Sequence, residues 1–218
     1  MAVNKHINFF EFEKAAIKPG CPLCTIVNER ADRYIDNLLF EHVADRGFRA
    51  VFRAAGGFCP FHSRNLVSFR DGLAVAILSR DILEDRIATF SRSGKWSPRG
   101  QCPICIEKAK IEEEYLSFLA STDGNSDEEK ELREIMTACD GLCVPHYASL
   151  LHTPKGWPRS VPRWIKNLHE EKFFKLLERV DKYIELSAYG RQEEFAALSE
   201  KDQLVWKEAA ASLRGNVE

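Results

Sequence analysis

The feature that most constrains this chain is a pattern of cysteines and histidines that occurs twice. In the first copy, CPLC at 21–24 is followed after 34 residues by CPFH at 59–62. In the second copy, CPIC at 102–105 is followed after 37 residues by CVPH at 143–146. The three extra residues fit in the turn-rich stretch 121–129, where an insertion is easily tolerated. The matched spacing predicts an internal duplication.

The residue types in this pattern are those of a closed metal site. A Cys-Pro-x-Cys turn, here called a knuckle, points two sulfurs at one spot, and a later Cys-x-x-His adds a third sulfur and an imidazole. Three thiolates and one neutral imidazole fill a tetrahedral zinc shell, so such a site is structural and its binding contributes to folding. The predicted ligands of two Zn²⁺ ions are Cys21, Cys24, Cys59, His62, Cys102, Cys105, Cys143 and His146.

Sequence alone leaves the grouping of these ligands open. Grouping within each copy would join the knuckle at 21–24 to 59–62, and the knuckle at 102–105 to 143–146. The exchanged grouping would instead join Cys21 and Cys24 to Cys143 and His146. We expect the local grouping, because closing a shorter loop costs less entropy.

Hydrophobic periodicity predicts a mostly α-helical protein of two tandem zinc-knuckle units and a C-terminal helical extension. The units are expected at 1–91 and 92–160, and the extension at 161–218, all within one compact domain. Long helices are expected at 72–91 and 161–187, and a last helix at 200–213. Other predicted helix signals are the capping box Ser126 to Glu129, a stripe of Phe173, Leu177, Val180 and Ile184, and a stop at Gly215.

Composition favours an ordinary globular protein in the cytoplasm. The 218 residues carry 31 basic and 33 acidic side chains, and this formal net charge of −2 gives no general attraction to nucleic acid or membrane. The longest apolar run, 73–78, is too short to span a bilayer, and the N-terminus lacks the features of a secretory signal. Seven cysteines, an odd number, argue against a fully paired disulfide framework.

Three kinds of function stay open. The first is a non-enzymatic zinc-held scaffold that binds another protein. The second is a redox or cofactor-handling protein in which the same ligands hold an iron-sulfur cluster or exchange thiols. The third is a nucleic-acid binder that uses basic, tryptophan-containing loops at 91–100 and 153–164. Its candidate residues are Lys155, Trp157, Arg159, Arg163, Trp164 and Lys166.

Other candidate sites are weaker. The sequence has no phosphate-binding glycine loop, nucleophile elbow or His-Glu-x-x-His, so enzymatic activity is uncertain and not expected. The carboxylates Asp81, Glu84 and Asp85 share a helix face that we interpret as solvated. Cys139 has no counterpart in the other copy and is expected to be a buried thiol. The unmatched histidines, His6, His42, His152 and His169, are expected at the surface or satisfied in the core.

The duplicated CPLC…GFCPFH and CPIC…GLCVPH, together with the C-terminal VWKEAAASLRG, resemble the prokaryotic domain of unknown function 6062. The likeness extends from Cys21 to Gly215 and depends mainly on the eight Cys and His positions. This chain lacks the family's usual Lys-His-Asp-Tyr-Arg-like stretch and has LSAYGRQ at that position. The resemblance implies paired metal-type motifs and no particular activity.

Overall fold

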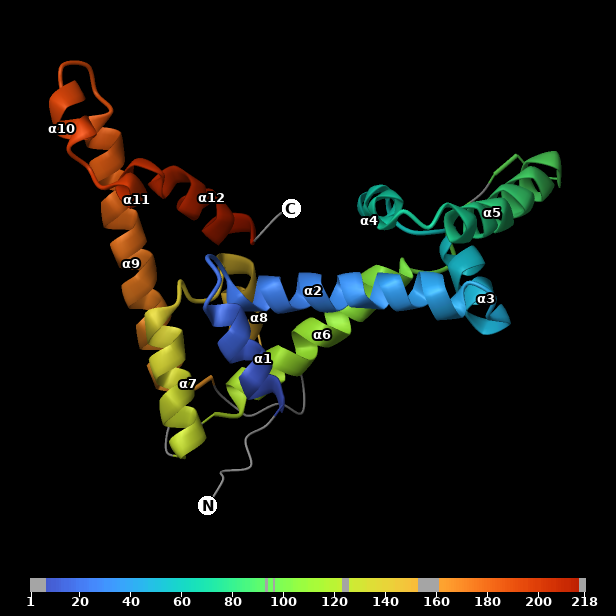
Figure 1. Cartoon of the computed structure of the whole chain (residues 1–218), viewed down its shortest axis with the longest axis horizontal. Coiled ribbons are helices and arrows are strands. Elements are labelled where there is room, and N and C mark those ends of the chain that lie inside the picture. The colour runs from blue at the N-terminus through green and yellow to red at the C-terminus, as the bar shows by residue number, and fades with distance from the viewer. Residues whose placement is uncertain (1–6, 93, 96, 123–125, 153–160, 216–218) are drawn as a thin grey trace. The chain divides into compact units, whose positions relative to one another are not determined.

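The computed structural model describes residues 7–92, 94–95, 97–122, 126–152 and 161–215. These residues are mostly α-helical and include no strand, which confirms the predicted fold class (Figure 1). The elements in chain order are α1 (Ile7–Ala16), α2 (Pro22–Asn37), the π-helix η1 (Leu38–His42), α3 (Arg46–Ala55), α4 (Pro60–Leu66), the 3₁₀ turn η2 (Val67–Phe69), α5 (Gly72–Arg92), α6 (Pro103–Ala120), α7 (Asp127–Ala138), α8 (Val144–Leu151), α9 (Arg163–Leu186), α10 (Gln192–Ala196), α11 (Glu200–Gln203) and α12 (Val205–Arg214).

The chain forms two compact units whose boundaries differ from the predicted 1–91, 92–160 and 161–218. Unit 1 consists of Met1–Ile26 and Glu113–Glu218, and unit 2 consists of Val27–Glu112. Both boundaries fall inside helices, within α2 and within α6. The periodicity of one long helix is continuous, so it carries no signal for the residue at which the helix leaves one core and enters another.

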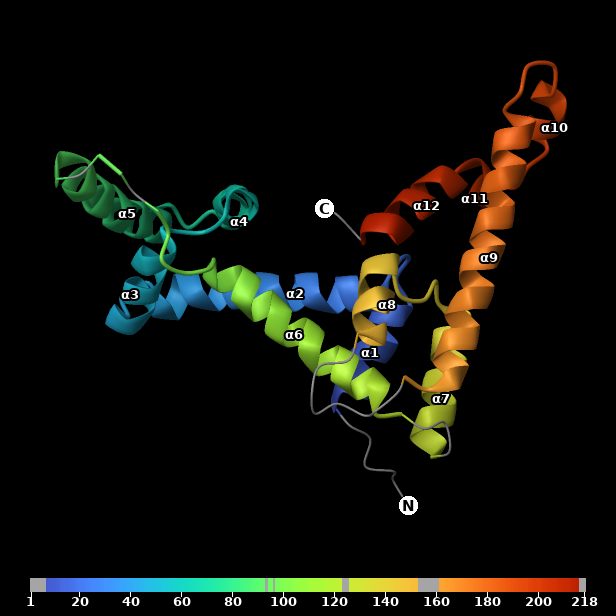
Figure 2. The same cartoon turned by 180° about the vertical axis from the view of Figure 1, so that it is seen from behind.

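Unit 1 is built on large apolar side chains from α1, α6, α7 and α9. The fully buried members include Phe9, Phe12, Tyr115, Leu132 and Ile165. Helix α1 packs against α7, and α12 packs against both α8 and α9, as both views of the chain show (Figures 1 and 2). This packing places the C-terminal end of α12 beside the start of α8.

Unit 2 has its own core, formed by α2, η1, α3, α5 and the start of α6. Its buried residues include Ile35, Leu38, Phe52, Leu78 and Ile104. Helix α3 starts at Asp45, whose side chain accepts a hydrogen bond from the Phe48 amide at 2.6 Å. A compact core in each unit gives each Cys/His cluster its own rigid support.

Several local predictions are confirmed. The capping box is present, with Ser126 and Glu129 each bonding the backbone amide of the other. The helix expected at 72–91 is α5, and the helix expected at 161–187 is α9. The expected last helix is divided at Leu204 into α11 and α12, and it stops at Gly215 with a φ of 81°.

The expected stripe lies on α9, but it is only partly buried. Phe173 and Val180 are half-buried, but Leu177 and Ile184 are exposed. The buried positions of α9 are Ile165, His169 and Leu186. Helix α9 therefore presents apolar side chains both to the core and to its outer face.

Candidate metal centres

The two Cys-x-x-His segments adopt the same local structure. Cys59 and Cys143 are the N-caps of α4 and α8, with φ and ψ of −65° and 164° in one and −66° and 162° in the other. Each follows a glycine of positive φ, 96° at Gly57 and 84° at Gly141. This left-handed turn, which glycine adopts without strain, brings each cysteine to a helix start.

The two knuckles also match. Pro22 and Pro103 begin α2 and α6, a helix position that suits proline because its missing amide has no intrahelical partner there. The amides of Thr25 and Ile106 donate to the carbonyls of Cys21 and Cys102 at 3.2 and 3.1 Å. In both copies, therefore, the first knuckle cysteine immediately precedes a helix and the second lies in its first turn.

The structure brings the eight predicted ligands together in two clusters. The buried cluster, in unit 1, consists of Cys21, Cys24, Cys143 and His146. The open cluster, in unit 2, consists of Cys59, His62, Cys102 and Cys105. Within each cluster the four ligand atoms lie within 4.8 Å of one another.

The buried cluster is closely spaced. His146 Nδ1 lies 3.4 Å from the sulfurs of Cys21 and Cys24 and 3.2 Å from the sulfur of Cys143. The sulfurs of Cys24 and Cys143 are 3.7 Å apart. All four residues are buried.

The open cluster has nearly the same spacing. His62 Nδ1 lies 3.2, 3.5 and 3.4 Å from the sulfurs of Cys59, Cys102 and Cys105. The sulfurs of Cys59 and Cys105 are 3.8 Å apart. Here Cys105 is exposed and Cys59 is half-buried.

These spacings fit a single tetrahedral ion. Zinc bonds of about 2.3 Å to sulfur and about 2.0 Å to nitrogen put two sulfurs about 3.8 Å apart and a sulfur and a nitrogen about 3.5 Å apart. The sulfur-to-sulfur and sulfur-to-nitrogen distances in both clusters are close to these values. A disulfide needs its sulfurs at about 2.0 Å, so the same geometry keeps the cysteines as separate ligands.

The electrostatics of both clusters favour a bound cation. Burial raises the pKa of the Cys21 thiol well above 9.0, with further contributions from Cys143 and Cys24. Desolvation, followed by the charge of Cys102, raises the pKa of Cys105 to about 12. Hydrogen bonds with Cys143 and Cys21 lower the pKa of Cys24, so the buried cluster favours one thiolate by itself. A bound dication would favour deprotonation of the remaining thiols in each cluster.

The histidine of the open cluster is suited to bind metal. Burial lowers the pKa of His62 below 6.5, and the positive charge of Lys108 lowers it further. The imidazole is therefore neutral at pH 7, and Nδ1 can offer its lone pair to an ion.

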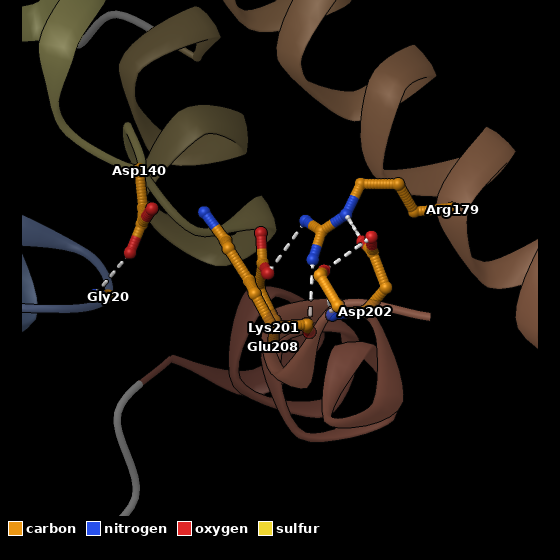
Figure 3. A network of polar contacts seen from close by, with 7 residues as sticks. Gly20, Asp140, Arg179, Lys201, Asp202 and Glu208 are labelled. Carbon is orange, nitrogen blue, oxygen red and sulfur yellow. Dashed lines mark hydrogen bonds and ion pairs between the residues drawn. The ribbon is translucent and has the colours of Figure 1, made fainter. Parts of the chain in front are cut away.

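A second layer of contacts holds the buried cluster. The amide of Leu142, next to Cys143, donates to His169 Nε2 at 2.9 Å, and His169 Nδ1 donates to the Ile165 carbonyl at 2.9 Å. The amide of Gly20, next to Cys21, donates to Asp140 at 2.7 Å (Figure 3). These bonds fix the two loops that carry the ligands. The sequence predicts that His169 lies either at the surface or in the core with its hydrogen bonds satisfied. The structure confirms the core position.

Gly215 completes the wall of the buried cluster. A Cβ at this position would lie 2.9 Å from the Cys24 sulfur and 3.6 Å from the Cys143 sulfur. The backbone at Gly215 thus lies closer to the sulfurs than a residue with a side chain could without a shift of its neighbours. Sequence reasoning gave Gly215 only as a helix stop.

The expected local grouping of ligands is wrong. The knuckle at 21–24 meets 143–146, and the knuckle at 102–105 meets 59–62, so the smaller loop is nested inside the larger one. The entropy of closing a loop of this larger size rather than a 34-residue loop differs by only about 1 kcal/mol. Packing of the helices in each unit outweighs a term that small.

The remaining candidate residues lie apart from the two clusters. Cys139 is a buried thiol, as expected, and its sulfur accepts from the Gly141 amide at 3.4 Å. The prediction of a solvated Asp81 is wrong, because Asp81 is buried and accepts from Arg49 Nε at 2.6 Å. His42 and His152 are exposed, and His6 lies outside the described residues.

The proposed nucleic-acid loops are described only in part. Trp96, Lys155, Trp157 and Arg159 lie outside the described residues. Of the others, Arg163 is exposed, whereas Lys166 and Trp164 are half-buried. The interaction with nucleic acid stays a prediction.

Comparison with known proteins gives one distant relative. The chain is 28% identical over 174 residues to the "Uncharacterized 23.9 kDa protein in xynA 3'region" of Caldicellulosiruptor sp. (strain Rt8B.4), an alignment that covers 78% of this chain and 83% of the relative. No family model matches the chain. No solved structure matches it either. Within the described part of the chain, none of the helices combines the length and apolar character that crossing a membrane requires.

Proposed function

We propose that this protein is a non-enzymatic helical scaffold held by two structural zinc ions. The observation that carries the proposal is the double occurrence of three thiols and one imidazole at the spacing of a tetrahedral shell. Four protein ligands leave no open position for a substrate or an activated water, which is the arrangement of structural rather than catalytic zinc. Each ion would join a knuckle to a Cys-x-x-His helix start from the other copy.

The alternative is an iron-sulfur cluster on the same ligands. Such clusters usually use four cysteines, with histidine the exception, whereas each site here contains one histidine. Ligand atoms within 4.8 Å of one another also support one ion rather than several irons. Zinc is therefore the better match to both sites.

Metal analysis with a visible spectrum on anaerobically purified protein tests this choice. The proposal predicts two zinc ions per chain and no visible absorption. Iron with a visible absorption band would contradict it and support the cofactor-handling alternative. We also propose a cytoplasmic location, supported by the free cysteines, and membership of the domain of unknown function 6062 on the strength of the eight Cys and His positions.

We further propose that the scaffold binds a protein partner on the outer face of α9. Phe174, Leu177 and Ile184 are 66%, 53% and 64% exposed and share one side of this helix. The exposed acidic residues Glu178 and Asp181 lie beside them, whereas Glu185 already pairs with Arg191 at 2.5 Å. An amphipathic helix whose apolar face is flanked by lysines or arginines would match this surface in both polarity and charge.

A photo-crosslinking residue in place of Leu177 tests the partner proposal in cells, with the same residue in place of Lys182 as the matched control. The proposal predicts a crosslink to one protein from position 177. The purified pair should then bind, and Ile184→Glu should abolish this binding with two metals still present. A crosslink only to a second copy of this chain, or binding that survives Ile184→Glu, would contradict the proposal.

A further inference from the structure

A large cavity in unit 1 lies beside the buried cluster. Its volume is about 930 Å³, and Cys21 and Cys143 form part of its wall. The other walls are the segments 16–20 and 138–142, one side of α9, and the facing residues of α11 and α12. Small-molecule sites are concave and have volumes of about 300–1,000 Å³, so this cavity is large enough for a ligand.

Basic residues outnumber acidic residues in the cavity wall, although the whole chain has a formal net charge of −2. Its two acidic residues are Asp140 and Glu208. Its six basic residues are Lys18, Lys172, Lys175, Arg179, Lys201 and Lys207. Such a concentration of cations in a concave site attracts and holds anions.

Three of these cations already have structural partners, and one of them is Lys175, which binds Glu171 at 2.5 Å. Arg179 binds Asp202 at 2.7 Å and Glu208 at 2.8 Å, which ties α9 to α11 and α12 (Figure 3). Lys172 Nζ donates to the carbonyl of Cys139 at 2.6 Å. These bonds shape the cavity rather than serve a ligand.

Lys201 and Lys207 are placed differently. In Figure 3 the Lys201 side chain extends from α11 into the space between Asp140 and Arg179. Its ammonium group makes no hydrogen bond or ion pair with the residues that the structure describes. The Lys207 ammonium lies 5.3 Å from the centre of the Trp206 ring, a contact that leaves its N–H donors available.

The cavity also has an apolar side. Phe173, Leu176, Leu204 and Ala211 line it together with the cations. A ligand that satisfies both sides carries several negative charges at one end and an apolar body at the other. Phosphate groups present more charge and more acceptor oxygens than a single carboxylate, so they match a wall with two available lysines better.

We propose that this cavity binds an organic phosphate of about the size of a nucleoside diphosphate. Lys201 and Lys207 contact the phosphates, and Leu176 and Leu204 contact the apolar body. The site depends on an ordered unit 1, and hence on an occupied buried cluster, but it is separate from the partner surface proposed on the outer face of α9.

Calorimetry on the full chain with both metals bound tests the proposal. The probes are ADP, inorganic pyrophosphate and adenosine at low salt. The proposal predicts that ADP binds and adenosine does not, and that added salt weakens binding because it screens the charges. The double variant Lys201→Gln/Lys207→Gln should weaken ADP binding by about tenfold or more, since it removes two charge-assisted contacts.

Lys182→Gln is the matched control, because Lys182 is an exposed lysine of α9 that does not line the cavity. It should leave ADP binding unchanged, and metal content should be the same in every variant. Pyrophosphate binding as tight as that of ADP would contradict an organic ligand, because the contacts of Leu176 and Leu204 with its apolar body would then add nothing to the affinity. The proposal is overturned if neither ADP nor pyrophosphate binds at low salt, or if the double variant binds ADP as well as the unaltered chain. Neither result would change the metal count, so failure here is distinguishable from failure of the zinc proposal.

Discussion

The buried cluster and the open cluster have the same ligand types, the same helix starts and nearly the same spacing. They differ in how far the surrounding residues cover the ligands and shield them from solvent. All four ligands of the buried cluster are less than 10% exposed, and Gly215 lies against one side of it. In the open cluster Cys105 is exposed and Cys59 is half-buried. The repeated motif therefore specifies the ligand geometry, and the surrounding helices decide how far solvent reaches the metal.

The largest expected difference between the clusters is the rate of metal release. A chelator reaches the open cluster through Cys105. Cys21 and Cys143 are only 4% and 3% exposed at the cavity wall, so release from the buried cluster depends mainly on local unfolding of unit 1. We expect two phases of release to a chelator, with rates that differ by about tenfold or more. The Cys105→Ser variant alters only the open cluster, so the metal in its buried cluster should still be released in the slow phase. A single phase in the unaltered protein would contradict the difference in cover.

Gly215→Val should remove much of that difference. Its side chain would press on the Cys24 sulfur, from which even a Cβ would be only 2.9 Å away. We expect metal release from the buried cluster to accelerate toward the rate of the open cluster. Gly190→Val is the matched control, because Gly190 also has a positive φ, 91°, but a Cβ there would have no neighbour within 4 Å. Equal acceleration in both variants would mean that backbone strain, and not cover, controls release.

The stability of unit 2 should depend on its core as well as on its exposed metal site. The buried Asp81 carboxylate binds Arg49 through both Nε and Nη2. We expect Asp81→Asn to lower the free energy of unfolding of unit 2 by about 2 kcal/mol in a urea titration, with two metals retained. The exposed Glu84, 3.6 Å from Arg80, provides the control Glu84→Gln, which should have little effect.

The Asp81 interaction also predicts a pH dependence. Hydrogen bonding to Arg49 is the main cause that lowers the pKa of Asp81 below 3.8. Its contribution is therefore fully present above pH 3.8 and is lost as the pH falls through the lower pKa of the folded state. Asp81→Asn should lack this acid-dependent component. An equal stability of the two proteins at pH 7 would contradict the structural role of the pair.

The smallest expected effect concerns His169, behind the buried cluster. Burial lowers its pKa below 6.5, so protonation favours the unfolded state. Stability from His169 is fully present above pH 6.5 and is lost as the pH falls through the lowered pKa. His169→Gln should destabilise unit 1 by about 1 kcal/mol at pH 7.5, because it disturbs the bond from the Leu142 amide. The difference between the two proteins should shrink at pH 5.5, and parallel curves would contradict this role.

Much of the local structure could be predicted from the sequence, because its signals act over a few residues. The capping box at Ser126, the stop at Gly215 and the eight ligand positions depend on short-range chemistry. The grouping of ligands could not be predicted, since it depends on which helices share a core. The cover that Gly215 gives to Cys24 joins residues far apart in the chain, and no local pattern reports it. Asp81 was misplaced for the same reason, because its partner Arg49 is on another helix.

Metal content of two double cysteine variants tests the central claim, the exchanged grouping of ligands, most directly. Cys24→Ser/Cys143→Ser alters only the buried cluster, whereas Cys24→Ser/Cys59→Ser alters both clusters. Cys139→Ser, which changes a buried thiol outside both clusters, is the control and should keep two metals per chain. The structure predicts that the first double variant retains one metal and the second retains none. The opposite result, none in the first and one in the second, would contradict the exchanged grouping and restore the local one.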